Sequence, residues 1–180
     1  MTLGEMKKKT LALIEELDTN DVTLTGDPDI ANKINYVINQ IQNELSRIKK
    51  IPAYKEIDVL KDELITFEDL DTNVYQISVV HNIDHEYKAD GTIIKALENG
   101  KAEVEYYIYP TQIDDTTLDT QELDLSIDVL EIMPYGIAAD VLKSDVSNGY
   151  GNIYANRYNE LKQLLDMRYN TGSIEIEGGY

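Results

Sequence analysis

The sequence predicts an α+β fold: a small helical bundle of about four helices, a β-rich antiparallel insertion and an extended, strand-like C-terminal arm. Three observations predict it. Apolar residues recur at three- and four-residue steps in the first and last parts of the 180-residue chain. Between them lie β-prone runs separated by turn dipeptides. The charge balance changes at the same places, which indicates an inserted module with a different surface.

Composition narrows the class of protein. The chain has 34 acidic and 16 basic residues, a net charge of −18, no cysteine and 42% hydrophobic residues. The hydrophobic content can form a core, so wholesale disorder is not expected. The lack of cysteine excludes a disulfide scaffold, a thiolate zinc site and a cysteine nucleophile. The acidity disfavours binding to nucleic acid or anionic lipid, and neither a membrane span nor a signal peptide is apparent, so we expect a soluble protein.

The acidic residues concentrate in the middle of the chain. Residues 1–54 have seven basic and eight acidic side chains, residues 55–127 have five and eighteen, and residues 128–180 have four and eight. We therefore predict N-terminal helices over 1–54, an acidic β-rich insertion with its return linker over 55–124, C-terminal helices over 125–170 and an interaction arm over 171–180. The helical host would then be nearly neutral.

Two helices are predicted in the first segment. Thr2 and Glu5 have the spacing of a capping box, and the apolar pattern that follows extends to Leu17. A turn over residues 20–26 separates it from a second helix. That helix starts at Asp27-Pro28, carries one continuous apolar stripe to Ile48 and is ended by Pro52.

The middle segment reads as strands. Residues 74–80 are β-rich, and Asp90-Gly91 and Asn99-Gly100 are hairpin dipeptides, which predict a meander over residues 74–109. Shorter strands are expected at 56–59 and 64–67, and residues 111–124 form the return linker. Tyr106, Tyr107 and Tyr109 should point to both faces of the sheet.

Helical periodicity resumes after Ser126. A short helix is kinked by Pro134 and continues to about Val146, residues 148–151 turn, and a last helix runs over about 152–168. Beyond it, residues 173–177 alternate apolar and acidic side chains without a local partner. This tail is either a frayed terminus or a strand that adds to another chain.

No pattern of residues in the sequence positively indicates catalysis or metal binding. His81 and His85, four residues apart around Asp84, lack a third strong ligand at motif spacing, so surface histidines are favoured over a zinc site. The acidic stretches that could chelate calcium lack the pattern of an EF-hand loop; they comprise Asp69 and Asp71, and Asp114, Asp115 and Asp119. There is no Gly-flanked serine elbow and no phosphate-binding loop. We predict no enzyme, no catalytic residue, no cofactor and no metal.

Tyrosines and lysines suggest contacts instead. Tyr150, Tyr154 and Tyr158 fall on one face of the last helix, either as a core stripe or as an intersubunit contact. The run Lys7-Lys8-Lys9 is interpreted as a solvated helix face, with contact to an acidic neighbour as the alternative.

One stretch resembles a known family. Residues 128–145, Asp-Val-Leu-Glu-Ile-Met-Pro-Tyr-Gly-Ile-Ala-Ala-Asp-Val-Leu-Lys-Ser-Asp, are followed by Gly149-Tyr-Gly and Tyr154-Ala-Asn-Arg-Tyr158. This pattern, with the helix opened by Asp27-Pro28-Asp29-Ile30, resembles the head–tail connector (adaptor, or head-completion) proteins of tailed bacteriophages and prophages of Gram-positive bacteria. The similarity covers residues 1–54 and 125–169. The smallest members of that family lack a β-rich insertion.

The resemblance implies a structural role in the virion neck. Family members typically form twelve-subunit rings under the portal protein, extend the DNA channel without sequence-specific binding, and dock a stopper or tail-completion protein. The protein would reside at the head–tail interface of the virion, and in the host cytoplasm during assembly. Candidate interface residues are Tyr154, Arg157 and Tyr158 on the last helix, and Ile174, Ile176 and Tyr180 on the C-terminal arm.

Two alternatives stay open. An acidic DNA mimic that inhibits a nucleic-acid-binding protein would explain the net charge directly, but it predicts acids along one continuous surface rather than in one segment. A ligand-binding β-module on a helical base, for carbohydrate or calcium, would use the tyrosines of the predicted sheet.

Overall fold

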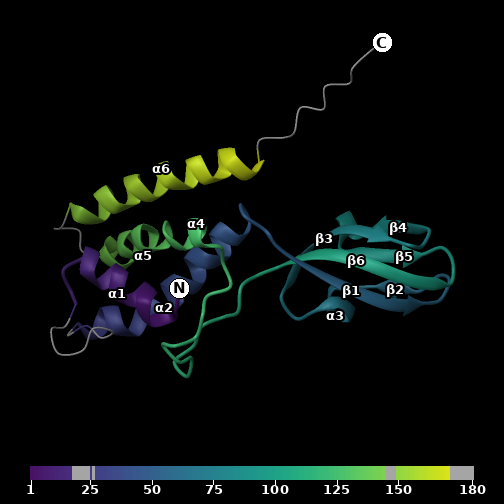
Figure 1. Cartoon of the computed structure of the whole chain (residues 1–180), viewed down its shortest axis with the longest axis horizontal. Helices are drawn as coiled ribbons and strands as arrows, with labels where there is room; N and C mark the ends of the chain where they lie inside the picture. The colour runs from purple at the N-terminus through teal and green to yellow at the C-terminus, as the bar shows by residue number, and fades with distance from the viewer. Residues whose placement is uncertain (18–24, 26, 145–148, 171–180) are drawn as a thin grey trace, which may run out of the picture. The chain divides into compact units, whose positions relative to one another are not determined.

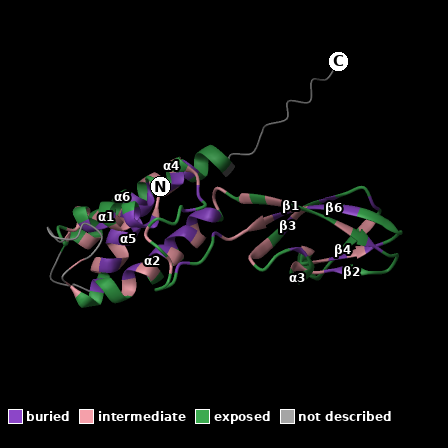
Figure 2. Ribbon diagram, turned by 60° about the horizontal axis from the view of Figure 1, so that its bottom comes forward, coloured by how far each residue is buried: buried purple, intermediate pink, exposed green. Residues whose placement is uncertain are grey.

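The computed structural model describes residues 1–17, 25, 27–144 and 149–170. The chain forms two compact units: a helical unit of residues 1–49 and 112–180, and a β unit of residues 50–111 (Figure 1). Figure 2 shows buried residues in both units. Helices and antiparallel strands are segregated along the chain, so the predicted α+β class is confirmed.

Helix α1 (Leu3–Leu13) begins at the predicted capping box. The Thr2 hydroxyl accepts a hydrogen bond from the Glu5 N–H (3.2 Å), and the Glu5 carboxylate accepts one from the Thr2 N–H (2.9 Å). The helix ends before Leu17, earlier than the apolar pattern predicts, because the backbone at Glu15 is left-handed, with φ 61°. Its buried apolar side chains are Leu3, Met6 and Leu11.

Helix α2 (Pro28–Ser46) starts and packs as predicted. The Asp27 carboxylate accepts hydrogen bonds from the N–H groups of Asp29 (2.8 Å) and Ile30 (3.4 Å), and proline occupies the first helical position. The predicted apolar stripe is buried at Ile30, Ile34, Val37, Ile38, Ile41 and Leu45, whereas its last member, Ile48, lies beyond the end of the helix and is half-buried.

The described residues of the helical unit contain three further helices: α4 (Ile127–Leu130), α5 (Met133–Val141) and α6 (Tyr150–Asn170), with a 3₁₀ turn, η2 (Leu142–Ser144), after α5. The predicted break at Pro134 is confirmed, because α4 ends and Pro134 lies in the first turn of α5, where a missing N–H is harmless. Helix α5 packs against α1, α2 and α6. It is therefore the central helix of the bundle.

Gly136 sets the distance between α5 and its neighbours. A Cβ atom at Gly136 would lie 2.9 Å from Cε2 of Tyr158 on α6 and 3.0 Å from Cδ1 of Ile41 on α2. Both distances are shorter than the separation at which carbon atoms attract one another. A side chain at this position would therefore push two helices away from α5.

We expect Gly136→Ala to lower the free energy of unfolding by about 1–2 kcal/mol, because overpacking (about 1–3 kcal/mol) outweighs the helical gain from alanine (about 0.5–1 kcal/mol). Gly151→Ala in α6 is the matched control, since its new Cβ would meet Leu142 Cβ at an ordinary 3.5 Å. Urea unfolding followed by circular dichroism measures both variants. Equal stability of the two would show that α5 is not tightly confined.

Residues 112–124 pack along the helical unit rather than forming a free linker. The Asn39 side chain donates to the Ile113 carbonyl (2.7 Å) and accepts from the Ile113 N–H (2.8 Å). Further on, the Leu3 N–H donates to the carbonyl of Gln121 (2.8 Å). The insertion accordingly spans residues 50–111 instead of 55–124, and its return segment belongs to the bundle.

This boundary changes where the acidity lies. Residues 112–124 carry five acidic and no basic side chains. The β unit then has six basic and thirteen acidic residues, net −7, and the helical unit has ten and twenty-one, net −11. The expectation of a nearly neutral helical host is therefore wrong, because both units carry an acidic excess.

The β unit contains two three-stranded antiparallel sheets. One has the order β1 (Ile51–Val59), β6 (Gly100–Ile108), β3 (Val74–His81); the other has the order β2 (Leu64–Ile65), β5 (Ile93–Ala96), β4 (His85–Lys88). A one-turn helix, α3 (Phe67–Leu70), and a 3₁₀ turn, η1 (Ala89–Gly91), lie in the connections.

The predicted strand at 74–80 and the hairpin at Asp90-Gly91 are confirmed, but the meander is wrong. Strand β5 pairs with β4 and β2, whereas β6 pairs with β1 and β3. The connection at Asn99-Gly100 therefore leads from one sheet to the other instead of closing a hairpin. A turn dipeptide indicates a reversal of the chain, and shared core packing decides which strands pair.

Both sheets contribute to one apolar core. Its members are Val59, Ile65, Leu70, Ile77, Val80, Ile83, Ile94, Ala96, Ala102, Val104 and Tyr106. Strand β1 begins at Ile51, before the predicted boundary, because Pro52 lies on an edge strand, where proline is tolerated. Ile51 pairs with Ile108, so the unit begins and ends on neighbouring strands.

Candidate protein interface

Helix α6 is fixed to the bundle by few buried side chains. Among its described side chains, Tyr158 and Leu165 are buried, with 6% and 4% exposed. Large apolar side chains on the same helix are instead exposed, by 60% for Ile153 and Leu164. The helix therefore has two different faces, and polar contacts supplement its small apolar contact.

Tyr158 is part of the core of the bundle. Its hydroxyl donates to Glu44 Oε2 on α2 (3.0 Å), and Lys162 Nζ donates to Glu44 Oε1 (2.7 Å). Burial, and then the charge of Glu44, raise the pKa of Tyr158, so it remains a neutral donor. The predicted roles of Tyr158 are a core residue or an intersubunit contact. In the structure it is a core residue that packs within its own chain.

Tyr154 and Arg157 occupy different surroundings. The half-buried Tyr154 donates its hydroxyl to the carbonyl oxygen of Leu13, at the end of α1. Arg157 is exposed, and its guanidinium lies 3.3 Å from the Glu160 carboxylate one turn later. Of the three interface candidates on α6, Arg157 presents its charged group to solvent.

A polar network around Asp128 holds the far end of α6. The Asp128 carboxylate accepts hydrogen bonds from Ser126 Oγ (2.5 Å), from Lys49 Nζ (3.1 Å) and from the Tyr169 hydroxyl. Partial burial would raise the pKa of Asp128, but hydrogen bonds from Ser126, Tyr169 and Lys49 outweigh it and hold the pKa well below its usual range. One ionised side chain thus joins the end of α2, the start of α4 and the last turn of α6.

Asp128→Asn is expected to lower the free energy of unfolding by about 1–2 kcal/mol at pH 7, because charge-assisted hydrogen bonds are lost. The pKa is depressed in the folded state, so the contribution of the carboxylate is complete above the unfolded pKa of about 3.9 and declines as pH falls through the folded pKa. The stability difference between variant and parent should therefore shrink below about pH 4.

Thermal unfolding at pH 7 and pH 3 measures this difference. Glu131→Gln is the matched control, since the Glu131–Lys9 pair is 57% and 44% exposed and contributes little. An undiminished Asp128→Asn effect at pH 3 would mean that shape, and not charge, accounts for the loss.

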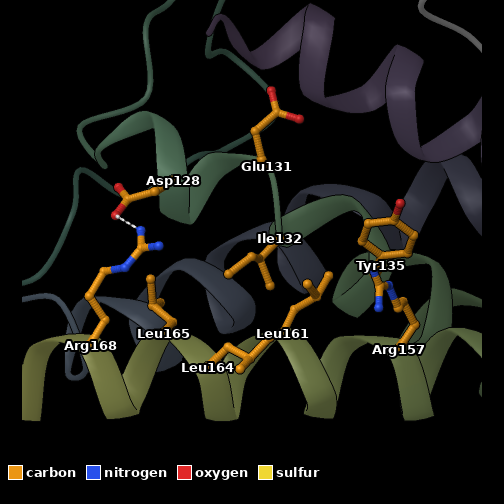
Figure 3. Close-up of a pocket in the computed structure, with 9 residues that line it drawn as sticks. All are labelled: Asp128, Glu131, Ile132, Tyr135, Arg157, Leu161, Leu164, Leu165 and Arg168. Atoms are coloured by element: carbon orange, nitrogen blue, oxygen red, sulfur yellow. Dashed lines mark ion pairs between the residues drawn. The ribbon is translucent and has the colours of Figure 1, made fainter. Parts of the chain in front are cut away.

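A groove lies between α6 and the α4–α5 segment, with a volume of about 370 Å³. Figure 3 shows Arg157 and Arg168 toward opposite ends, with leucines of α6 between them and Ile132 across the groove. Arg168 lies 4.0 Å from Asp128. An apolar centre with charged ends can receive apolar side chains of a protein partner.

Three tyrosines of the β unit, Tyr75, Tyr107 and Tyr109, pack against one another. Tyr106 is buried in the core, whereas Tyr107 lies on the other face of the sheet, as the alternation predicts. The Tyr75 ring lies 4.5 Å from that of Tyr109 and 6.4 Å from that of Tyr107, with Lys50 Nζ 4.5 Å from the Tyr107 ring. These three rings therefore form one cluster.

His81 is the last residue of β3, and His85 is the first residue of β4. His81 Nε2 is 3.3 Å from the Glu105 carboxylate, and His85 Nδ1 is 3.2 Å from the Ile83 carbonyl. In the described part of the chain, no group of three or more histidine and acidic side chains is arranged to hold a metal ion.

The candidate calcium ligands Asp69, Asp114 and Asp119 have hydrogen-bond or ion-pair partners within the chain. Asp69 accepts from the Thr66 N–H at 2.8 Å, and Asp114 accepts from the Thr116 N–H at 2.8 Å. Asp119 pairs with Lys7 at 2.9 Å. Two lysines of the Lys7-Lys8-Lys9 run form ion pairs within the helical unit, Lys7 with Asp119 and Lys9 with Glu131. This run is therefore not a purely solvated helix face.

The remaining interface candidates lie outside the described residues. Ile174, Ile176 and Tyr180 belong to residues 171–180, so their role in an interaction arm stays a prediction.

Within the described ranges, none of the helices combines the length and the apolar character needed to cross a membrane. Neither a protein-family model nor a curated protein matches this chain.

Proposed function

We propose that this protein is a structural head–tail connector of a tailed phage or prophage virion. It acts without catalysis, cofactor or metal. It assembles as an oligomeric ring under the portal protein, extends the DNA channel and docks the next neck or tail component. It is made in the host cytoplasm and resides in the virion neck.

The observation that carries the proposal is the position of the residues that resemble the connector family. The run over residues 128–145 contains the central helix α5, the close contact at Gly136 and the hydrogen-bonded Asp128. Gly136 allows the close approach of neighbouring helices, and Asp128 accepts hydrogen bonds that hold α6 to the bundle. The residues that carry the resemblance are therefore ones that shape the bundle, and this supports the proposal.

The surface of α6 supports an assembly role. An exposed apolar face and a groove with arginine side chains at its ends leave protein-binding surface on a helix that is already folded against its own bundle. Exposed apolar surface of this kind is typical of interaction sites. The described residues offer no comparable constellation for catalysis.

The charge suits a channel through which DNA passes. Both units are acidic, with net charges of −7 and −11, so each unit as a whole repels phosphate groups. Repulsion of this kind extends only about 8 Å at physiological ionic strength. DNA can therefore pass without being gripped.

A second candidate, the acidic DNA mimic, gains support from the same charge distribution. The sequence boundaries confined the acids to one segment, whereas the structure divides them between both units. A mimic requires acids over much of its surface, which this division allows.

Negative-stain electron microscopy of the purified protein, alone and mixed with portal rings, tests the proposal. We expect rings, or added density on the portal, and no such density with an unrelated acidic protein of similar size. A chain that leaves portals unchanged but binds a basic DNA-binding protein with nanomolar affinity would support the mimic and contradict the connector.

A further inference from the structure

The exposed face of α6 carries a regular line of six side chains. Their positions advance by three, four, three, four and three residues, which places them along one seam of an α-helix. All six are 53–66% exposed. They are Tyr150, Ile153, Arg157, Glu160, Leu164 and Met167, and we call this set the α6 seam.

The α6 seam reads the same in both directions. From either end it presents two apolar side chains, then two opposite charges, then two apolar side chains. An identical helix running antiparallel therefore places Arg157 opposite Glu160 and Ile153 opposite Leu164, twice each. A parallel copy would instead oppose Arg157 to Arg157 and Glu160 to Glu160, which is repulsive.

We propose that α6 pairs with the α6 helix of a second copy of this chain, antiparallel and about a two-fold axis between Arg157 and Glu160. Within one helix these two side chains already lie 3.3 Å apart, so both charged groups point to the centre of the seam. Pairing adds two interchain ion pairs there, flanked by apolar contacts on both sides.

The neighbouring groove widens this contact. Leu164 belongs both to the α6 seam and to the groove lining, and Ile132 and Leu161 continue the apolar surface beside it (Figure 3). Side chains of the second copy would therefore meet a second wall from the α4–α5 segment. The seam from Tyr150 to Met167 is about 25 Å long at 1.5 Å per residue.

This dimer is separate from the connector function. A two-fold contact uses the same surface on both copies and closes on itself, so it cannot propagate around a ring. It describes a state of the free protein in which the exposed face of α6 is covered, so it would have to open before that face could contact other neck proteins; ultracentrifugation without portal detects it whether or not the connector proposal holds. Because the interface is one helix pair, we expect a dissociation constant on the order of 10 µM.

Analytical ultracentrifugation of the full chain over micromolar concentrations tests the pairing, in about 0.15 M salt to screen the net charge of −18. We expect a monomer–dimer equilibrium. Arg157→Glu should weaken it roughly tenfold or more, because glutamates then face each other, and Arg157→Glu with Glu160→Arg should restore it.

Lys8→Glu, the same change of charge at an exposed site on α1, is the control and should leave dimerisation unchanged. Circular dichroism checks that every variant is folded. A monomer at all concentrations, an unaffected Arg157→Glu variant or a double variant that fails to restore the dimer would each overturn the proposal.

Cysteine cross-linking tests the direction of pairing, because the native chain has no cysteine. Ile153→Cys and Leu164→Cys variants, when mixed under mild oxidation, should form a disulfide between the two variants. Each variant alone should not cross-link, since identical positions lie about 16 Å apart along the seam. Self-cross-linking of Ile153→Cys would indicate parallel pairing and overturn the proposal.

Discussion

Tyr158→Ala is expected to lower the free energy of unfolding by about 3–5 kcal/mol, the usual loss for a large aromatic side chain removed from a core. Tyr158 is 6% exposed, fills the space above Gly136 and joins α6 to Glu44. Tyr158→Phe keeps the ring and loses the hydroxyl hydrogen bond, so about 1 kcal/mol is expected. Urea denaturation of both variants measures the difference.

The same pair of variants separates packing from an intersubunit role. A tyrosine used between subunits would leave the monomer of Tyr158→Ala as stable as the parent and impair only assembly. A coupled test is Gly136→Ala in the Tyr158→Ala background, where the conflict with the ring is removed and the contact with Ile41 Cδ1 at 3.0 Å remains. There the alanine should destabilise the protein less than it does in the parent, because the new Cβ atom no longer meets the Tyr158 ring.

Asn39→Ala is expected to lower the free energy of unfolding by about 2–4 kcal/mol, because it leaves two buried backbone groups unpaired at about 1–3 kcal/mol each. Asn39 holds both the N–H and the carbonyl of Ile113, and Ile113 is 6% exposed. Hydrogen exchange over residues 112–124 should accelerate as this segment leaves the bundle.

Asn35→Ala is the matched control on the same face of α2. Its contacts with Asp114 and Asp115 are exposed and 3.4–3.5 Å long, so a loss below about 1 kcal/mol is expected. Similar losses at Asn35 and Asn39 would contradict a specific role for the Asn39–Ile113 pair.

Features that depend on neighbouring residues could be predicted from the sequence. The Thr2–Glu5 capping box, the start of α2 at Asp27 and the break at Pro134 all follow from contacts within one helical turn. The alternation of Tyr106 and Tyr107 follows from strand geometry in the same way.

Features that depend on distant partners could not be predicted. Asn39 and Ile113 are 74 residues apart, and Asp128 and Lys49 are 79 apart. The one local signal was the spacing of Asn35, Asn39 and Asn43, which places three amides on one face beside an apolar stripe. The acidic, Thr-rich composition of residues 112–124 predicts a linker, and without their contacts to the bundle the division of charge between the units cannot be predicted.

The candidate interface shows the same limit. Periodicity placed Tyr154 and Tyr158 on one face of the last helix, but it could not tell that this face covers the bundle. The exposed α6 seam runs along another side of the same helix and includes Arg157. A helix with apolar side chains on two sides has a weak amphipathic pattern. The exposed apolar side can therefore be recognised only after the structure shows which side is buried.

The strand pair at the base of the β unit has a practical consequence. Nine consecutive residue pairs, from Ile51–Ile108 to Val59–Gly100, bring the two ends of the unit together. The ends of this 62-residue module are therefore as close together as the ends of a hairpin loop, so the module can connect the same two points of the helical unit as a short loop would. Such a module can be gained, lost or exchanged in a single genetic event, and a fluorescent or affinity domain with adjacent termini could replace it to follow assembly.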